Sequence, residues 1–136
     1  MKYLGVDFGL RKIGLAISEG ELASPWQVLE VKGFSDAVEK ISRIIEDNNF
    51  DKIVVGLPEG KMGQNVTGFV SALRKKGFEV ETSDETLSSK KALTVMIEQG
   101  VRRKGRRREE DAYSAAGILQ EYLDSRSVVA RSERSE

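Results

Sequence analysis

Residues 3–18 read YLGVDFGLRKIGLAIS, and their pattern is the strongest sequence evidence for the fold class. It contains two short β-prone runs, residues 3–8 and 13–18, separated by the four residues GLRK, which is the pattern of a β-hairpin. A third run with strand character follows at residues 26–31. We therefore expect the chain to begin with three strands in an antiparallel meander.

The next informative segment after this hairpin is KIVVGL at residues 52–57. A continuous apolar run of this length is typical of a strand that is covered on both faces in a parallel arrangement. The remaining periodicities predict a strand at 78–83 and helices at 35–48, 66–77, 88–99 and 109–124, with Ser35 and Ser88 as N-caps. Strands that start in a hairpin and then alternate with helices predict an α/β fold, a mixed sheet of about five strands flanked by helices.

The chain has 136 residues, which suits one compact domain. We expect this domain to span residues 1–124 and the polar segment 125–136 to be a disordered tail. No apolar run approaches the roughly 18 residues that a membrane span needs, and MKYLGVDFG does not have the pattern of a secretory signal. Because the chain also lacks cysteine, the expected location is the cytoplasm.

The absence of histidine and cysteine restricts the possible chemistry. Imidazole bases, thiolate nucleophiles and the usual zinc ligands are excluded, so polar chemistry should depend on carboxylates and a hard cation. Asp7 is the first candidate, because it lies near the end of the first predicted strand, on the side opposite Val6 and Phe8. Its neighbours Gly5 and Gly9 leave room for a metal ion or a large anion, although a strand-end aspartate can also simply start a turn.

Asp111 is the second candidate. Helical spacing places it on one stripe with Ala115, Ile118 and Tyr122, so it should face inward from the first turn of the last helix. Glu109 and Glu110 are explained by the helix dipole, but an inward carboxylate has a desolvation penalty that is typically several kcal/mol. Asp111 therefore needs a cationic partner.

Glu85 is the third candidate, in the segment SDETLSS that follows the strand at 78–83. If that strand runs parallel to the first one, Glu85 lies on the same sheet edge as Asp7; Asp84 could replace it, and the pair could instead serve helix entry. Three carboxylates brought together repel one another unless divalent cations neutralise them. Two Mg²⁺ ions about 4 Å apart can clamp a phosphoryl displacement, so the acids predict a metal-dependent phosphodiesterase.

The segment VRRKGRRR at residues 101–108 carries six positive charges in a chain whose formal net charge is zero. A compact basic block on an otherwise acidic protein is typical of a surface that binds a polyanion, because each neutralised phosphate releases counterions. The alternative is a solvated loop that only favours solubility. The block favours a nucleic-acid partner over this alternative.

Four motifs resemble the YqgF family of RNase H-like proteins, which includes Holliday-junction-resolvase-like proteins and pre-16S rRNA nucleases. They are VDFGLRKIGLAIS, IVVGLP, DETLSS and RRREEDAYSAAGILQEYL, in this order and spacing. The resemblance extends to about Asp124 and implies an RNase H-like fold. It also implies two-metal hydrolysis of a nucleic-acid backbone, in which one Mg²⁺ or Mn²⁺ ion activates water and the other stabilises the leaving 3′ oxygen.

The resemblance assigns catalysis and metal binding to Asp7, Glu85 and Asp111. It further implies phosphate contacts from the basic residues Arg11, Lys12, Lys61, Arg102, Arg103, Lys104, Arg106, Arg107 and Arg108. The chain departs from the family pattern at two places: Thr86, Ser88 and Ser89 replace an arginine and threonines, and Gly60 replaces an asparagine. Neither departure removes a metal ligand, and Glu110 and Asp84 are candidates for a fourth acid.

The preferred function is nucleolytic maturation of the 5′ end of the small-subunit rRNA precursor. Resolution of four-way DNA junctions uses the same chemistry but calls for a two-fold dimer, and the sequence leaves both monomer and homodimer open. A function of another class is a non-catalytic nucleic-acid-binding factor. The loop from Asp7 to Gly14 could also be the phosphate loop of an actin-like or sugar-kinase-like ATPase, but those enzymes close two domains over the nucleotide.

Overall fold

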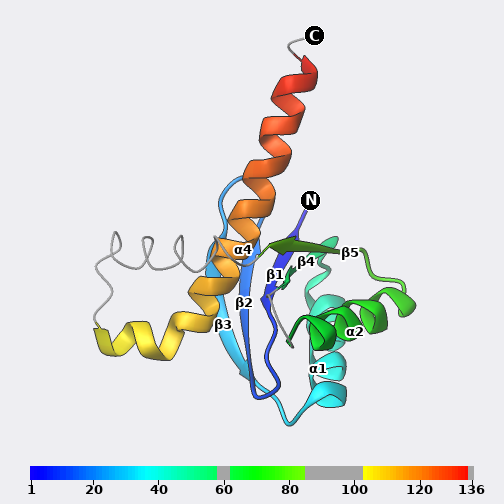
Figure 1. Ribbon diagram of the computed structural model, residues 1–136, viewed down its shortest axis with the longest axis vertical. Helices are drawn as coiled ribbons and strands as arrows, with labels where there is room; N and C mark the ends of the chain where they lie inside the picture. The colour runs from blue at the N-terminus through cyan, green and yellow to red at the C-terminus, as the bar shows by residue number, and fades with distance from the viewer. Residues whose placement is uncertain (58–61, 85–102, 135–136) are drawn as a thin grey trace.

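A computed structural model describes residues 1–57, 62–84 and 103–134 of the chain; within these ranges, residues 62, 84, 103–109 and 127–134 are described by their backbone alone. The described elements form a sheet with helices on both faces (Figure 1). The predicted α/β architecture is therefore confirmed.

The sheet has five strands in the order β3-β2-β1-β4-β5. The first three strands, β1 (Tyr3–Asp7), β2 (Lys12–Ser18) and β3 (Ser24–Glu30), pair antiparallel as the predicted meander. Strand β4 (Lys52–Leu57) pairs parallel with β1 on one side and with β5 (Val80–Asp84) on the other. The carboxyl ends of β1, β4 and β5 consequently lie at the same edge of the sheet.

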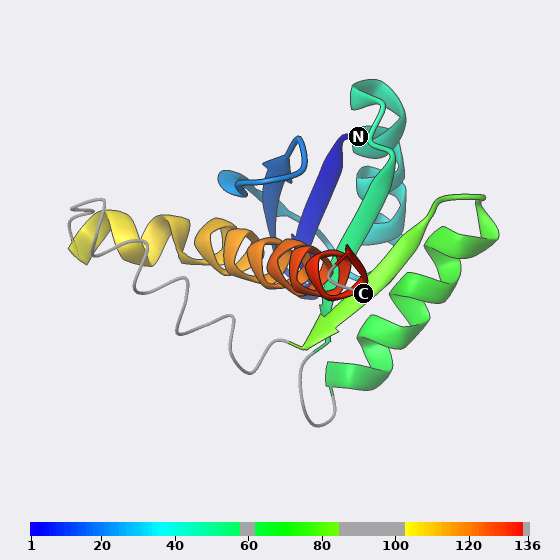
Figure 2. The same ribbon diagram turned by 90° about the horizontal axis from the view of Figure 1, so that it is seen from above.

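The described helices are divided between the two faces of the sheet. Helices α1 (Phe34–Asn48) and α2 (Met62–Lys75) cover one face, and the long helix α4 (Arg103–Arg134) crosses the other face, as Figure 2 shows. Helix α4 contacts all five strands. The fold is thus a three-layer sandwich whose second helical layer, in the described residues, consists of α4.

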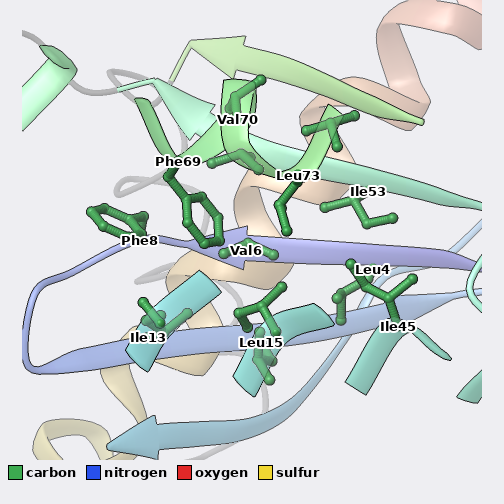
Figure 3. Close-up of a cluster of buried hydrophobic side chains, with 14 of the residues drawn as sticks. Leu4, Val6, Phe8, Ile13, Leu15, Ile45, Ile53, Phe69, Val70 and Leu73 are labelled. Atoms are coloured by element: carbon green, nitrogen blue, oxygen red, sulfur yellow. The ribbon is translucent and has the colours of Figure 1, made fainter. Parts of the chain in front are cut away.

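Strand alternation divides the core into two clusters. On the α1/α2 side, Leu4 and Val6 of β1 are fully buried against Phe69 and Leu73 of α2 (Figure 3). On the other side, Tyr3, Ala16 and Val54 pack against α4. Strand β4 contributes to both clusters, with Ile53 and Val55 on one face and Val54 on the other, which confirms that KIVVGL is covered on both faces.

The start of α1 differs from the prediction. The helix begins at Phe34 after Gly33, whose φ of 134° only glycine adopts readily, and no side chain caps it. Ser35 is therefore not the N-cap. Instead, the Asp36 carboxylate accepts a hydrogen bond of 2.8 Å from the backbone N–H of Lys32, and this bond holds the pKa of Asp36 below its usual value.

The bounds of α4 also differ from the prediction of 109–124. The helix begins at Arg103, within the basic block that we expected to precede it, and it continues to Arg134 through most of the segment expected to be a disordered tail. Apolar periodicity could not mark either end, because the flanking segments are polar all round. The division of the chain at residue 124 stays a prediction, and the helix predicted at 88–99 lies outside the described residues.

None of the described helices combines the length and the apolar composition that a bilayer span requires.

A polar network joins α4 to the sheet at the end opposite Asp7. Lys52 Nζ lies 3.4 Å from Glu81 Oε1, the Tyr122 hydroxyl hydrogen-bonds Glu81, and Arg126 Nη1 donates to Tyr122 Oη at 2.6 Å. The hydrogen bond from Tyr122 and then the charge of Lys52 hold the pKa of Glu81 below its usual value. Burial, and next this same hydrogen bond, raise the pKa of Tyr122.

From this network we predict that the wild type loses folding stability in acid and that Glu81→Gln abolishes this pH dependence. Because the carboxyl pKa is lower in the folded state, ionised Glu81 stabilises the fold above the ordinary glutamate pKa of about 4.3. The benefit disappears as the pH falls through the lowered pKa. Glu81 is 45% exposed, so solvent screening limits the effect to at most about 1 kcal/mol.

Urea unfolding of the wild type and Glu81→Gln between neutral and strongly acidic pH measures this difference. The two free energies of unfolding should converge in acid. Glu79→Gln is the control, because that side chain is 71% exposed and 4.0 Å from Lys52. Parallel curves for the wild type and Glu81→Gln would contradict the assignment.

Candidate active site

Asp7 ends strand β1 with its side chain on the face that α4 covers. The alternation of the strand sets this direction: Leu4 and Val6 belong to the α1/α2 cluster, while Tyr3 packs against α4. Gly5 lies under α4 as well, since a Cβ there would be 2.8 Å from the Ala115 carbonyl oxygen and from Leu119 Cβ. Asp7 is half-buried, so its carboxylate is directed toward α4 at the rim of the sheet.

Gly14 is the contact point between the sheet and the part of α4 that carries Asp111. Gly14 is the cross-strand partner of Asp7 in the β1–β2 pair. A Cβ on Gly14 would be 1.7 Å from the Asp111 carbonyl oxygen and 2.8 Å from the Ala112 nitrogen, far closer than atoms can pack. The backbone of α4 therefore rests directly on Gly14.

This contact brings two of the three predicted acids together. Partners in an antiparallel pair have Cα atoms about 4.5 to 5.5 Å apart, so the residue that touches Gly14 is close to Asp7. Asp111 is half-buried, and the stripe that we expected below it is present, with Ala115 and Ile118 fully buried and Tyr122 8% exposed. The backbone of Asp111 in α4 thus lies beside the end of β1 that carries Asp7.

Asp111 does not lie in the first turn of its helix, where we predicted it. Because α4 begins at Arg103, residues 109–111 lie beyond its first turn, and the helix dipole does not account for Glu109, Glu110 or Asp111. Glu110 is exposed, as expected for a residue on the outer side of the helix. The inward direction of Asp111 comes from its position on the buried stripe.

The third acid, Glu85, lies outside the described residues, as do Gly60, Thr86, Ser88 and Ser89. Strand β5 ends at Asp84, the residue that precedes Glu85 in the chain. Because β5 runs parallel to β1 through β4, Asp84 is on the sheet edge that carries Asp7, as predicted. Among the side chains that the structure describes, no three acids are grouped closely enough to hold a metal ion by themselves.

A basic recess lies beside this edge, at the tip of the β1–β2 hairpin. It has a volume of about 430 Å³ and is lined by Leu10, Arg11, Lys12, Glu30, Val31 and Lys32. The backbone N–H of Val31 donates to the Arg11 carbonyl oxygen at 2.8 Å, which holds the end of β3 against the hairpin. Arg11 and Lys12 are exposed, so this recess can accept an anion.

Lys32 is a candidate phosphate contact that the sequence reasoning missed. The sequence predicted the antiparallel meander but not its register, which pairs Lys12 with Glu30 and brings the residues after β3 beside Arg11 and Lys12. Lys61 and Arg102 lie outside the described residues. The remaining members of the basic block form the first turns of α4, drawn in yellow away from the sheet in Figure 1; these are Arg103, Lys104, Arg106, Arg107 and Arg108.

Comparison with known proteins is consistent with this geometry. Residues 1–125 match the family described as "RuvX: Holliday junction resolvase". A protein of Bacillus cytotoxicus named "Putative pre-16S rRNA nuclease" is 36% identical over 138 residues, covering 93% of this chain and 100% of that protein. A protein of the same name from Natranaerobius thermophilus is 32% identical over 133 residues, covering 91% and 94%.

The fold is similar to that of T. thermophilus RuvC, whose structure was solved in complex with a Holliday junction substrate. The TM-score is 0.65, the sequence identity is 16%, and the match covers 93% of this chain and 96% of that one. At this identity the likeness concerns the fold alone. It confirms the predicted RNase H-like architecture.

Proposed function

The chain belongs to the RuvX family, the YqgF family that its motifs resemble, and from this membership we propose that it is a metal-dependent nuclease that hydrolyses phosphodiester bonds during 5′-end maturation of pre-16S rRNA. The names of its relatives support the substrate. The observation that carries the proposal is the Gly14 contact, which brings the backbone of Asp111 beside the strand end that carries Asp7.

The donors at this edge fit a hard divalent cation. Asp7 and Asp111 are both half-buried carboxylates on neighbouring backbone positions, and a divalent cation can be held by carboxylates from two such positions. We propose that Asp7, Glu85 and Asp111 hold Mg²⁺ or Mn²⁺, as two ions. When bound, these ions would lower the pKa of the attacking water and offset charge on the leaving 3′ oxygen.

The basic residues would bind and orient the nucleic-acid backbone. Arg11, Lys12 and Lys32 line the recess beside Asp7, where each can neutralise a phosphate without reading a base. Lys61, Arg102 and the basic residues of the first turns of α4 would extend this track. We place the protein in the cytoplasm, where a ribosomal RNA precursor is available to it.

Resolution of four-way DNA junctions is the second candidate, because the matched family carries that description. The chemistry would be the same, but two sites related by a two-fold axis would be needed to cut both strands of a junction. A monomer suffices for rRNA maturation. A two-fold dimer in solution would therefore favour junction resolution, and a monomer would favour rRNA maturation.

A side-by-side cleavage assay tests the proposed function. The purified chain is incubated with 5′-labelled pre-16S leader RNA or with a four-way DNA junction, in Mg²⁺, Mn²⁺ or EDTA. We expect cleavage of the RNA that depends on the divalent ion. Cleavage of the junction alone would reverse the order of the two candidates, and binding without cleavage of either substrate would make the chain a nucleic-acid-binding factor.

A further inference from the structure

Phe34 presents an aromatic ring to solvent at the first residue of α1. Its exposed fraction is 37%, whereas Phe8, Phe50 and Phe69 are exposed by 8% or less. An exposed aromatic ring is not unusual by itself. The residues around this ring indicate which kind of ligand it can bind.

The ring is held in place by its neighbours. It meets the edge of Phe8 at a centroid distance of 6.4 Å and an interplanar angle of 70°, and Phe8 in turn packs against Phe69 at 4.6 Å, as Figure 3 shows for Phe8 and Phe69. On the α2 side, a Cβ at Gly68 would be 3.6 Å from the ring of Phe34. The ring is therefore preorganised, so little side-chain conformational entropy is lost when a ligand packs on it.

The ring is also close to the basic recess. Phe8, which supports it, belongs to the α1/α2 cluster, so the ring lies on the sheet face opposite to Asp7, but Lys32, two residues before Phe34, lines the recess with Arg11 and Lys12. Two further apolar side chains are exposed at this edge. Leu10 lies in the loop after β1, and Leu57 is the last residue of β4. This edge of the sheet thus combines cations with apolar surface, which suits a ligand with both phosphates and flat aromatic groups.

We infer that Phe34 stacks on an unpaired nucleobase of the substrate, next to the phosphate held by Arg11, Lys12 and Lys32. This inference rests on the proposed nuclease function. Bases inside a duplex are already stacked on their neighbours, so only an unpaired base can reach the ring. Stacking on an aromatic side chain is tolerant of sequence, because every base has a π-face. The chain should therefore prefer substrates with an unpaired nucleotide beside the phosphate that the basic recess holds.

Binding assays with three variants at this position test the inference. Each variant is made in an Asp7→Asn background, which keeps the substrate intact, and is mixed with RNA that carries 2-aminopurine in an unpaired segment. Phe34→Ala and Phe34→Leu should bind this RNA about tenfold more weakly and lose the change in 2-aminopurine fluorescence. Phe34→Tyr should retain both. None of the three should alter the affinity for a fully paired duplex.

The leucine variant separates stacking from a structural role, since it keeps the apolar contact with Phe8 but lacks a π-face. If Phe34→Leu binds like the parent, the inference is wrong. Equal binding of all variants to both substrates would also overturn it and would leave the ring as a surface for a protein partner. Leu22→Ala is the matched control, because Leu22 is 78% exposed in the β2–β3 loop, at the opposite edge of the sheet.

The two hypotheses fail in different ways. Should the wild type cleave RNA while the Phe34 variants keep their preference for unpaired segments, the inference fails and the nuclease function stands. Absence of cleavage by the wild type, together with a fluorescence change that requires an aromatic residue at position 34, would contradict the nuclease function and leave base stacking intact.

Discussion

Asp7→Asn is expected to reduce metal-dependent cleavage by about 10³-fold, because we propose Asp7 as a metal ligand and such a ligand contributes several kcal/mol to stabilisation of the transition state. The substitution keeps the shape of the side chain and removes its negative charge. Binding of nucleic acid should be preserved or strengthened, because the lost charge opposed the phosphates. Single-turnover cleavage and filter binding on the same RNA measure the two effects separately.

Thermal unfolding gives a second readout for Asp7. Mg²⁺ or Mn²⁺ should raise the unfolding temperature of the wild type, since a ligand that binds the folded state stabilises it. The rise should be lost in Asp7→Asn. Asp47→Asn is the matched control: Asp47 is an exposed acid near the end of α1, and its substitution should change neither cleavage nor the metal response. Full activity in Asp7→Asn would exclude the proposed site.

Gly14→Ala is expected to damage both stability and activity. The new Cβ would be 1.7 Å from the Asp111 carbonyl oxygen, a backbone atom of a long helix that cannot turn aside as a flexible side chain would. The helix must shift, which should lower the free energy of unfolding by about 3 kcal/mol. Displacement of a catalytic group by about 1 Å can cost about 10²-fold in rate, so the residual folded protein should also cleave poorly.

Gly68→Ala is the control for a glycine substitution without a close contact. A Cβ at Gly68 would be 3.6 Å from the ring of Phe34, an ordinary packing distance, and alanine in a helix interior is favoured over glycine by about 1 kcal/mol. This variant should be at least as stable as the wild type in urea unfolding. If Gly14→Ala were as stable and active as Gly68→Ala, α4 could not rest on Gly14 as described.

The sequence predicted those features that follow from local periodicity. The alternation of residues 3–8 placed Asp7 opposite Val6, and the continuous apolar run at 52–57 identified a strand buried on both faces; both are confirmed. The stripe from Asp111 to Tyr122 was visible because the buried positions of a helix recur every three or four residues. The common edge of β1 and β5 followed once the strands were taken as parallel.

Features that depend on tertiary contact were not visible. Nothing in the residues around Gly14 indicates that a helix from the other end of the chain rests on it, because the contact joins positions almost a hundred residues apart. The start of α4 at Arg103 was missed since a charged segment gives no apolar period. Lys32 joined the recess only through the register of β2 and β3. The roles of Asp7, Glu85 and Asp111 stay predictions.

The order of the β1–β2 hairpin and α4 along the chain has a consequence for biosynthesis. The hairpin that carries Asp7 leaves the ribosome before α4, which carries Asp111. Until that helix emerges, the sheet face with Tyr3, Ala16 and Val54 has no cover from it, and nascent chains with such exposed apolar surface are prone to associate. A growing polypeptide therefore cannot bring Asp7 and Asp111 to the same edge of the sheet until α4 has been synthesised.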